Sequence, residues 1–452
     1  MRSGYAERDV HIVNRDKIAI LGTGYVGTAN AVGFAELGYQ VVGYDIDSRR
    51  IGALAAGIPP YREEGLAELL ARHLAGGHLT FVNDLAAAVR EANFIVIAVG
   101  TPSTDDGSAD LTALDAVVEA LRSTLMDRSA IVVLRSTVPA GTSDRIAARL
   151  GRLDVLFCPE FLREGNAVWD FLHPDRTIIG ADSERAAEAY AELMHPLDAS
   201  VIVTKRRDAE LIKGGANAFL ALKISFANEI ANLCGALDAN ALEVLRGIGT
   251  DRRIGEAYLT PGIGFGGPCF EKDVQSLEHV ARHNGSPSQL LQATLRVNDA
   301  QPRKVVDILE EELGELRGAQ IGVWGLAFKA GTDDLRSSLA LRVLDDLGAR
   351  GASAVAYDPA IESATLPGRT TLARSAMEAA DADALLVLTE WPEFSQVDPA
   401  SLAASLRRRI VVDGRNVLDG QRFARCGIRY RGVGRSMVPQ CEERMTVRSA
   451  RA

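Results

Sequence analysis

The sequence predicts an α/β protein in which two doubly wound, Rossmann-like domains are joined by a long central helix. Three observations predict it. Short apolar strands alternate with helical stretches near both ends of the chain, a glycine-rich turn follows the first strand, and one long helical pattern lies between the two ends. A chain of 452 residues has room for about two to four domains.

The amino-terminal part carries the first alternation. Residues 17–21 (KIAIL) form a short apolar run, a helical pattern follows the glycine turn as far as Ala35, and a second apolar run at 40–44 ends on Asp45. Further buried strands are predicted at 94–99, 131–134 and 177–180.

The middle of the chain differs in pattern. Residues 208–236 predict one long helix, which is suited to act as a spacer and as a dimerisation element. Its apolar stripe is formed by Ile212, Ala216, Phe219, Phe226, Ile230 and Leu233. Strands are expected again at 320–325, 354–357, 384–388 and 410–412, so we predict domains at 1–203, 204–302 and 303–452, with a polar, disordered tail after Val438.

Composition excludes several classes of protein. With 50 Lys and Arg against 60 Asp and Glu, the formal net charge of −10 argues against nonspecific nucleic-acid binding, which needs a basic surface. No apolar run approaches the roughly 20 residues of a membrane span, and the first 16 residues carry charges where a signal peptide would be apolar. Five scattered cysteines predict a reduced, cytoplasmic protein, and no metal site is expected.

The turn after the first strand has the spacing of a dinucleotide-binding loop. In Gly22-Thr23-Gly24-Tyr25-Val26-Gly27 the glycines would allow a tight turn, close approach to a pyrophosphate and close helix–strand packing. Asp45, about 20 residues further on, would accept hydrogen bonds from a ribose and repel a 2′-phosphate, which favours NAD over NADP. The alternative is an ordinary glycine turn and an unrelated aspartate.

A second glycine-rich segment, residues 261–273 (PGIGFGGPCFEKD), leads into Cys269. Close wrapping of a ligand and a nearby ammonium from Lys272 would suit a nucleophilic thiolate. The alternative is a buried, inert cysteine.

Two pairs with a spacing of four residues are further candidates. Lys213 and Asn217 share one face of the predicted long helix and could stabilise a developing oxyanion, unless they are a surface lysine and a helix asparagine. Glu160 and Glu164 could do acid–base work, or could be carboxylates at a helix N-terminus.

An ordered set of motifs between about residues 20 and 420 resembles the UDP-glucose/GDP-mannose dehydrogenase family. The motifs are Gly22–Gly27, Val99–Pro102, Ser136–Thr142, Pro159–Gly165 with Pro174–Arg176, Glu210–Lys213 with Asn217–Phe219, the Cys269 loop, Gly325–Lys329 with Thr332–Asp334, and Asp413–Arg415. The resemblance implies an NAD-dependent enzyme that oxidises a sugar alcohol carbon twice without releasing the aldehyde, through a thiohemiacetal and a thioester on Cys269.

The resemblance also implies roles for individual residues. The catalytic residues would be Cys269, Lys213, Asn217, Glu160, Asp273 and Thr137. NAD would contact Gly22, Gly24, Tyr25, Val26, Gly27, Asp45, Arg50, Thr101, Thr137, Glu164, Lys272 and Arg336. The nucleotide sugar would contact Glu160, Phe161, Leu162, Arg163, Glu164, Lys213, Asn217, Arg253, Tyr258, Leu259, Thr260, Pro261, Gly262, Gly266, Lys329 and Arg415. Arg253 would reach into a neighbouring subunit, which implies a homodimer or a larger homo-oligomer.

The segment Arg253-Ile254-Gly255 and the Gly-Phe-Gly-Gly sequence at 264–267 resemble the members of the family that act on UDP-glucose. The substrates dTDP-glucose and GDP-mannose remain open as alternatives. So does a non-catalytic NAD-binding protein, although such a protein would need none of Cys269, Lys213 and Asn217.

Overall fold

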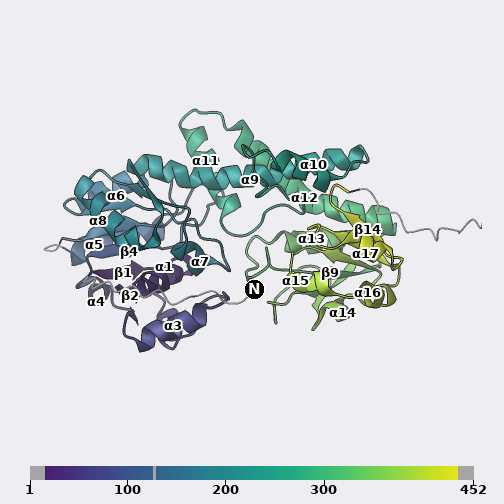
Figure 1. Ribbon diagram of the computed structural model, residues 1–452, viewed down its shortest axis with the longest axis horizontal. Coiled ribbons are helices and arrows are strands. Elements are labelled where there is room, and N and C mark those ends of the chain that lie inside the picture. Colours follow the sequence, from purple (N-terminus) through teal and green to yellow (C-terminus); the bar gives the residue numbers. More distant parts are fainter. Residues whose placement is uncertain (1–15, 126–128, 436–452) are drawn as a thin grey trace, which may run out of the picture. The chain divides into compact units, whose positions relative to one another are not determined.

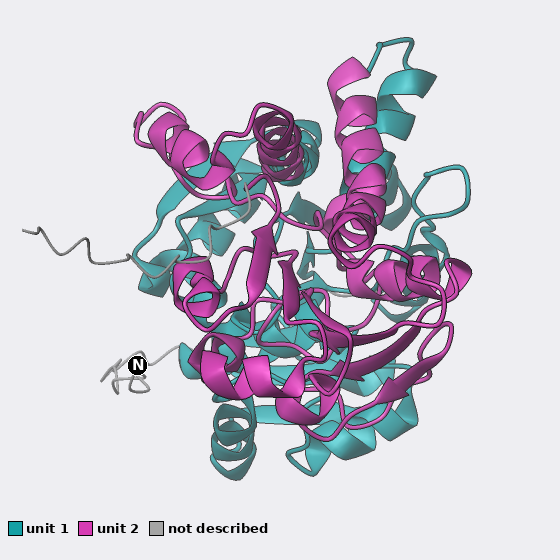
Figure 2. Cartoon of the chain, turned by 90° about the vertical axis from the view of Figure 1, so that its right-hand side faces the viewer, with its two compact units in different colours: residues 1–218, 272–288 teal, residues 219–271, 289–452 magenta. Residues whose placement is uncertain are grey.

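The computed structural model describes residues 16–125 and 129–435, so the predicted disordered tail after Val438 lies outside the described residues. The chain divides into two compact units (Figure 2). Unit 1 is formed by residues 1–218 and 272–288, and unit 2 by residues 219–271 and 289–452. The division into three domains stays a prediction. Among the described helices none is long and apolar enough to cross a membrane.

Unit 1 contains an eight-stranded sheet in the order β3-β2-β1-β4-β5-β6-β7-β8 (Figure 1). Its strands are β1 (Lys17–Leu21), β2 (Gln40–Tyr44), β3 (Leu79–Val82), β4 (Phe94–Ile97), β5 (Ile131–Leu134), β6 (Asp154–Phe157), β7 (Arg176–Gly180) and β8 (Ser200–Thr204). The first six follow the Rossmann order and are parallel, which confirms the predicted fold. β7 runs antiparallel to β6 and parallel to β8.

Alternating side chains of this sheet enter two separate cores. In β1, Ile18 and Ile20 pack into one core, while Ala19 and Leu21 pack into the other. Helices cover both faces, as a doubly wound sheet requires. The helices of unit 1 are α1 (Tyr25–Glu36), α2 (Ser48–Ala55), α3 (Leu66–Ala75), α4 (Leu85–Val89), α5 (Thr112–Thr124), α6 (Thr142–Leu150), α7 (Ala167–Leu172) and α8 (Glu184–Met194), with the 3₁₀ turn η1 (His195–Leu197).

Unit 2 repeats the Rossmann order in a parallel six-stranded sheet, β11-β10-β9-β12-β13-β14. The strands are β9 (Gln320–Trp324), β10 (Ser353–Tyr357), β11 (Thr370–Leu372), β12 (Ala384–Val387), β13 (Ile410–Asp413) and β14 (Arg429–Gly432). Its helices are α10 (Ala241–Gly249), α12 (Gln289–Leu313), α13 (Leu339–Ala349), α14 (Ala376–Ala379), α15 (Pro392–Gln396), α16 (Pro399–Ser405) and α17 (Gly420–Ala424). The predicted second Rossmann-like fold is therefore confirmed.

The predicted long helix is α9 (Arg206–Ala236), which begins in unit 1 and ends in unit 2 (Figure 1). α11 (Phe270–His283) likewise begins in unit 2 and continues in unit 1. The predicted apolar stripe of α9 is packed only in part, because Ile212 and Ile230 are partly buried against the cores. Phe219, Phe226 and Leu233 are 61%, 44% and 54% exposed, whereas the buried positions of the helix in unit 2 include small or polar residues such as Ala221, Ser225, Ala227, Asn228 and Ala231. Small side chains let neighbouring backbone approach, and the Ser225 hydroxyl donates to the Thr294 carbonyl of α12 at 2.8 Å.

Candidate active site

The carboxyl ends of five neighbouring parallel strands gather predicted site residues at one edge of the unit 1 sheet. Gly22 follows β1, Asp45 follows β2, Thr101 comes shortly after β4, Thr137 shortly after β5 and Glu160 shortly after β6. Ligands of open parallel sheets bind at this edge.

The glycine loop has the geometry of a phosphate site. Gly24 caps α1 without a side-chain hydrogen bond, and no acidic residue lies in the first turn of the helix. The first backbone N–H groups and the positive end of the helix dipole therefore face an open approach. A Cβ on Gly27 would lie 1.8 Å from the Gly22 carbonyl oxygen, so only glycine permits this strand–helix contact. An ordinary glycine turn does not explain these features.

Asp45 is a buried carboxylate at the start of the loop after β2. Its Oδ2 accepts the Thr23 amide at 2.8 Å and a guanidinium N–H of Arg50 at 2.9 Å. Burial on its own would raise the pKa of Asp45, but the amides of Asp47 and Thr23 and the Arg50 side chain outweigh burial and lower the pKa below its ordinary value. The group is therefore anionic near neutral pH and is tied to the glycine loop.

The loops after β4 and β5 are joined by two hydrogen bonds. The Thr101 hydroxyl donates to the Thr137 carbonyl at 2.6 Å, and the Ser136 hydroxyl donates to the Val99 carbonyl at 2.6 Å. The structure thus brings together two residues predicted to contact the cofactor.

Glu160 and Lys213 form a buried ion pair. The Lys213 Nζ lies 3.1 Å from the Glu160 Oε1, and the two residues are 3% and 7% exposed. The second oxygen of Glu160 accepts the Leu162 amide at 2.6 Å. The lysine is therefore not a surface residue, and Glu160 is not in a helix, because α7 begins only at Ala167.

Asn217 lies one turn after Lys213 on α9 and contacts Asp273. Its Nδ2 donates to the Asp273 Oδ2 at 2.6 Å, while the Lys272 ammonium lies 2.6 Å from the other oxygen. Asp273 is 3% exposed. The helix asparagine has the buried partner that its poor helix propensity calls for. One face of α9 thus presents an ammonium and an amide, each held by a carboxylate.

The rest of the Glu160 segment is more open. The Phe161 ring lies under the Arg176 guanidinium at 4.0 Å and under the Lys213 ammonium at 5.2 Å. The Arg163 side chain is 57% exposed and forms an ion pair with Asp170, 2.6 Å away, while Leu162 and Glu164 are half-buried.

In unit 2, Cys269 is an exposed thiol directly before the first residue of α11. The alternative hypothesis from the sequence, that Cys269 is a buried cysteine, is therefore wrong. Amides at a helix N-terminus favour negative charge on such a sulfur.

The glycine loop before Cys269 is held by buried amides that the sequence did not single out. Asn298 forms two hydrogen bonds with the Phe265 backbone. Its Oδ1 accepts the Phe265 amide at 2.7 Å, and its Nδ2 donates to the Phe265 carbonyl at 2.9 Å. Asn228 accepts the Gly262 amide at 2.8 Å. A Cβ on Gly264 would lie 2.4 Å from the Asn298 Oδ1. Asparagine inside a helix, the same signal that Asn217 gave, could have identified both residues.

Arg415 joins three segments of unit 2. Its guanidinium donates to the carbonyls of Leu388, Gly264 and Phe328 at 2.8, 3.1 and 3.1 Å. The Lys329 ammonium, from the next residue after Phe328, lies 5.9 Å from the Phe328 ring. The predicted substrate residues Gly262, Gly266, Lys329 and Arg415 therefore share one region.

Two other predicted arginines of unit 2 are more exposed. The Arg253 and Arg336 side chains are 84% and 66% exposed and pair with Asp251 and Asp334. Between Arg253 and the glycine loop, Tyr258 has φ +64°, Leu259 and Pro261 are buried, and Thr260 is exposed. In the described residues, the Arg253 side chain bonds to Asp251 and not to the segments that surround Arg415.

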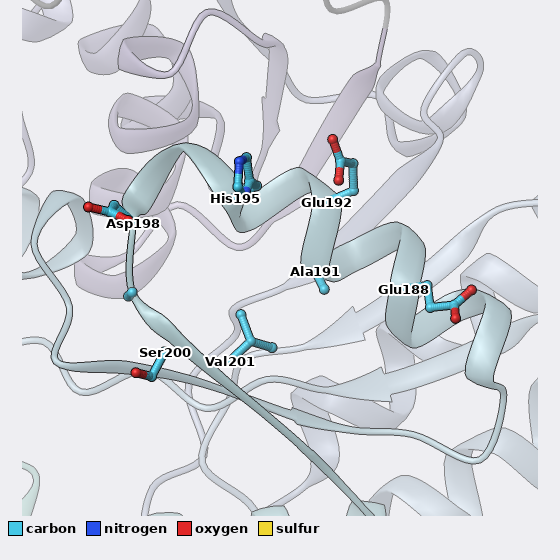
Figure 3. A pocket seen from close by; sticks show the side chains of 8 residues that line it. Glu188, Ala191, Glu192, His195, Asp198, Ser200 and Val201 are labelled. Atoms are coloured by element: carbon cyan, nitrogen blue, oxygen red, sulfur yellow. The ribbon is translucent and has the colours of Figure 1, made fainter.

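A surface pocket of about 620 Å³ lies elsewhere in unit 1, between α8, η1 and β8 (Figure 3). Glu188, Glu192, His195 and Asp198 contribute to its lining, and none of the predicted site residues does. Its acidic lining does not suit a phosphate-bearing ligand.

Comparison with known proteins places these features in a family. Three models of the UDP-glucose/GDP-mannose dehydrogenase family match in order: the NAD binding domain at residues 16–198, the central domain at 207–300 and the UDP binding domain at 322–420. The UDP-glucose 6-dehydrogenase TuaD of Bacillus subtilis is 41% identical over 435 residues, covering 93% of this chain and 94% of that protein. The UDP-glucose 6-dehydrogenase AglM of Haloferax volcanii is 43% identical over 423 residues, covering 89% and 97%.

Solved structures agree with the sequence comparisons. A UDP-glucose dehydrogenase from Pyrobaculum islandicum superposes with a TM-score of 0.87 at 40% identity, covering 94% of this chain and all of that one. A UDP-D-ManNAc dehydrogenase from Pyrococcus horikoshii gives a TM-score of 0.83 at 31% identity, with 93% and 99% covered.

Proposed function

The chain belongs to the UDP-glucose/GDP-mannose dehydrogenase family, and we propose that it oxidises UDP-glucose at C6 to UDP-glucuronate with two equivalents of NAD. The observation that carries the proposal is the buried pair Glu160–Lys213 beside the buried contact Asn217–Asp273. A protein that only bound a dinucleotide would have no use for these desolvated groups, which are costly to bury.

The cofactor is NAD, as the matched NAD binding domain indicates. The open first turn of α1 suits a pyrophosphate, and the anionic Asp45 suits a ribose with a free 2′-hydroxyl. When bound, NAD accepts the hydride equivalents that leave C6.

The first oxidation transfers a hydride from C6 to NAD and the hydroxyl proton to water, and gives an aldehyde. Lys213 and Asn217 stabilise negative charge on the C6 oxygen, because both donors are fixed and buried before the reaction begins. Glu160 holds the Lys213 ammonium in place.

The second oxidation passes through Cys269. Its thiolate adds to the aldehyde carbon and the former carbonyl oxygen takes a proton, which gives a thiohemiacetal. Departure of the second hydride to NAD, together with loss of that hydroxyl proton to water, leaves a thioester. Asp273 orients the reacting groups from the same helix that begins beside the sulfur.

Hydrolysis completes the reaction. Glu160 takes a proton from a water held by Thr137, the water oxygen adds to the thioester carbon, and the carbon–sulfur bond breaks to return the thiolate. The diphosphate of the substrate is neutralised by Lys329 and Arg415, together with Arg253 of the partner subunit.

We propose that the protein works as a homodimer or a larger homo-oligomer. Phe219, Phe226 and Leu233, which we term the α9 stripe, are spaced seven residues apart and exposed along one helix face. A second copy of the same helix would cover the α9 stripe symmetrically. We also propose a cytoplasmic location, because a nucleophilic Cys269 must remain reduced.

The test is a count of NADH per sugar. We expect two NADH for each UDP-glucose, and little turnover with dTDP-glucose, GDP-mannose or a UDP-N-acetylhexosamine. A preference for one of these other sugars would mean that UDP-glucose is not the substrate. One NADH per sugar would overturn the two-step reaction. Binding of NAD without oxidation of any nucleotide sugar would favour the non-catalytic alternative.

A further inference from the structure

Three buried amide side chains hold the backbone of the glycine loop that precedes α11 in unit 2. Asn228 of α9 accepts the Gly262 amide at 2.8 Å, and Gln301 of α12 donates to the Gly262 carbonyl at 3.1 Å. Asn298 of α12 accepts the Phe265 amide at 2.7 Å and donates to the Phe265 carbonyl at 2.9 Å. All three amide residues are buried, and we term them the amide clamp.

Two further backbone groups of this loop have partners in unit 2. The Ile263 amide donates to the Gly414 carbonyl at 2.9 Å, and the Arg415 guanidinium donates to the Gly264 carbonyl at 3.1 Å. Each residue from 262 to 265 is therefore fixed through its backbone by a partner outside the loop. The conformation of the loop does not depend on the side chains that the loop itself carries.

The amide clamp has an energetic cost that calls for a reason. A buried amide loses its hydration, and it is tolerated only while its hydrogen bonds are made. Apolar side chains would pack α9 against α12 without that requirement. A glycine-rich segment loses more backbone freedom on ordering than other sequences do. The clamp therefore provides what apolar packing does not, a single conformation of a segment that would otherwise populate many.

We infer that the amide clamp, and Asn298 above all, positions the glycine loop in the shape that binds the nucleotide sugar before the substrate arrives. This inference rests on the proposed function, in which Gly262 and Gly266 contact UDP-glucose. A loop that is ordered in advance does not have to lose its freedom on binding, so the clamp raises affinity through the loop rather than by a contact of its own with the substrate. It acts on the Kd and KM of the nucleotide sugar and not on kcat.

The experiment measures UDP-glucose binding to Asn298→Ala by titration calorimetry without NAD, and then steady-state kinetics. Two hydrogen bonds to the loop are lost, so the Kd and KM for UDP-glucose should rise roughly 10- to 100-fold, with kcat unchanged. Asn228→Ala removes only the acceptor of the Gly262 amide and should raise both by about three- to tenfold. It replaces Asn298→Ala if the latter does not fold. Binding of NAD, whose glycine loop and Asp45 belong to unit 1, should be unchanged in both variants.

Ser225→Ala is the matched control. The Ser225 hydroxyl of α9 is also buried and donates to the Thr294 carbonyl of α12 at 2.8 Å, one helical turn before Asn298. Its loss removes a hydrogen bond between the same two helices without touching the loop. Ser225→Ala should therefore lower the melting temperature and leave the Kd for UDP-glucose unchanged.

The outcomes separate this inference from the proposed function. Asn298→Ala and Asn228→Ala proteins that melt lower but keep the wild-type Kd and KM would overturn the inference alone. A fall in kcat at an unchanged KM would do the same. A wild-type protein that binds UDP-glucose but forms no NADH from it would overturn the proposed function, while the effect of the clamp on Kd would still be measured. A wild-type protein that does not bind UDP-glucose would overturn both.

Discussion

Asp358 occupies in unit 2 the position that Asp45 occupies in unit 1. Each directly follows the second strand of its Rossmann order and accepts an amide from the loop after the first strand. The Thr23 amide lies 2.8 Å from Asp45, and the Leu326 amide lies 2.7 Å from Asp358. Asp358 also accepts the Ala327 amide at 2.9 Å and the Trp391 indole at 3.1 Å. An aspartate after the second strand therefore stabilises packing in unit 2, whereas in unit 1 it is bonded to the glycine loop.

Asp45→Asn should weaken the preference for NAD over NADP. The carboxylate repels a 2′-phosphate and accepts from a ribose hydroxyl, and Arg50 would lose its partner and become available to the phosphate. We expect the ratio of kcat/KM values for NAD and NADP to fall roughly 10- to 100-fold, the size of one hydrogen bond to a charged group. Steady-state kinetics with both cofactors measures this ratio.

Asp358→Asn is the control for that experiment. It should lower the melting temperature, because the three donors at its Oδ2 would compete for a weaker acceptor, and it should leave the cofactor ratio unchanged. An Asp45→Asn enzyme with the wild-type ratio would show that Asp45 does not select the cofactor.

Lys213→Ala should lower kcat by about 10²–10³, the range for removing one fixed oxyanion donor. It also leaves Glu160 buried without its ammonium partner, so the melting temperature should fall too. Stopped-flow measurement of the first NADH formed isolates the step concerned. A rise in KM with an unchanged kcat would mean that the lysine only binds substrate.

Cys269→Ser should retain binding of NAD and UDP-glucose but lose steady-state turnover. The hydroxyl is scarcely ionised near neutral pH, and an ester hydrolyses less readily than a thioester, so a covalent sugar adduct should accumulate. Intact-protein mass spectrometry detects it. Cys426→Ser, at a half-buried cysteine of unit 2, is the matched control and should turn over normally. Wild-type kinetics in Cys269→Ser would remove the thiol from the mechanism.

Phe226→Asp should convert the proposed homodimer to monomers, because a carboxylate would be buried at the centre of the α9 stripe. Light scattering coupled to size-exclusion chromatography measures the mass. Ile58→Asp, at a side chain 59% exposed in unit 1, should leave the mass unchanged. A dimer that survives Phe226→Asp would place the interface elsewhere.

Strands with continuous apolar runs were predictable from the sequence. The predicted ranges 17–21, 40–44 and 131–134 coincide with β1, β2 and β5, because each run is fully or alternately buried between helices. The edge strands β8 and β11 were not predicted. β8 is exposed at four of its five positions and β11 has only three residues, so neither gives a burial pattern to detect.

The site was predictable where the signal is local. The spacing Gly22-x-Gly24-x-x-Gly27 predicted a phosphate loop without the structure, and the family motifs named Glu160 and Lys213. Their contact depends on how α9 packs against the end of β6, and local pattern carries no information about that. The α9 stripe was predicted as apolar, but its exposure could not be foreseen, because alanines and polar residues fill the packed face.

The exposure of Cys269 bears on how the protein is handled and labelled. Of the four cysteines in the described ranges, Cys158 and Cys234 are buried and Cys426 is half-buried, so an alkylating reagent under native conditions should meet Cys269 first. Purification without a reductant would oxidise the same sulfur before the others. A mildly electrophilic tag therefore offers a single attachment point within the described chain, and protection of that point by nucleotide sugar would provide a binding assay that needs no turnover.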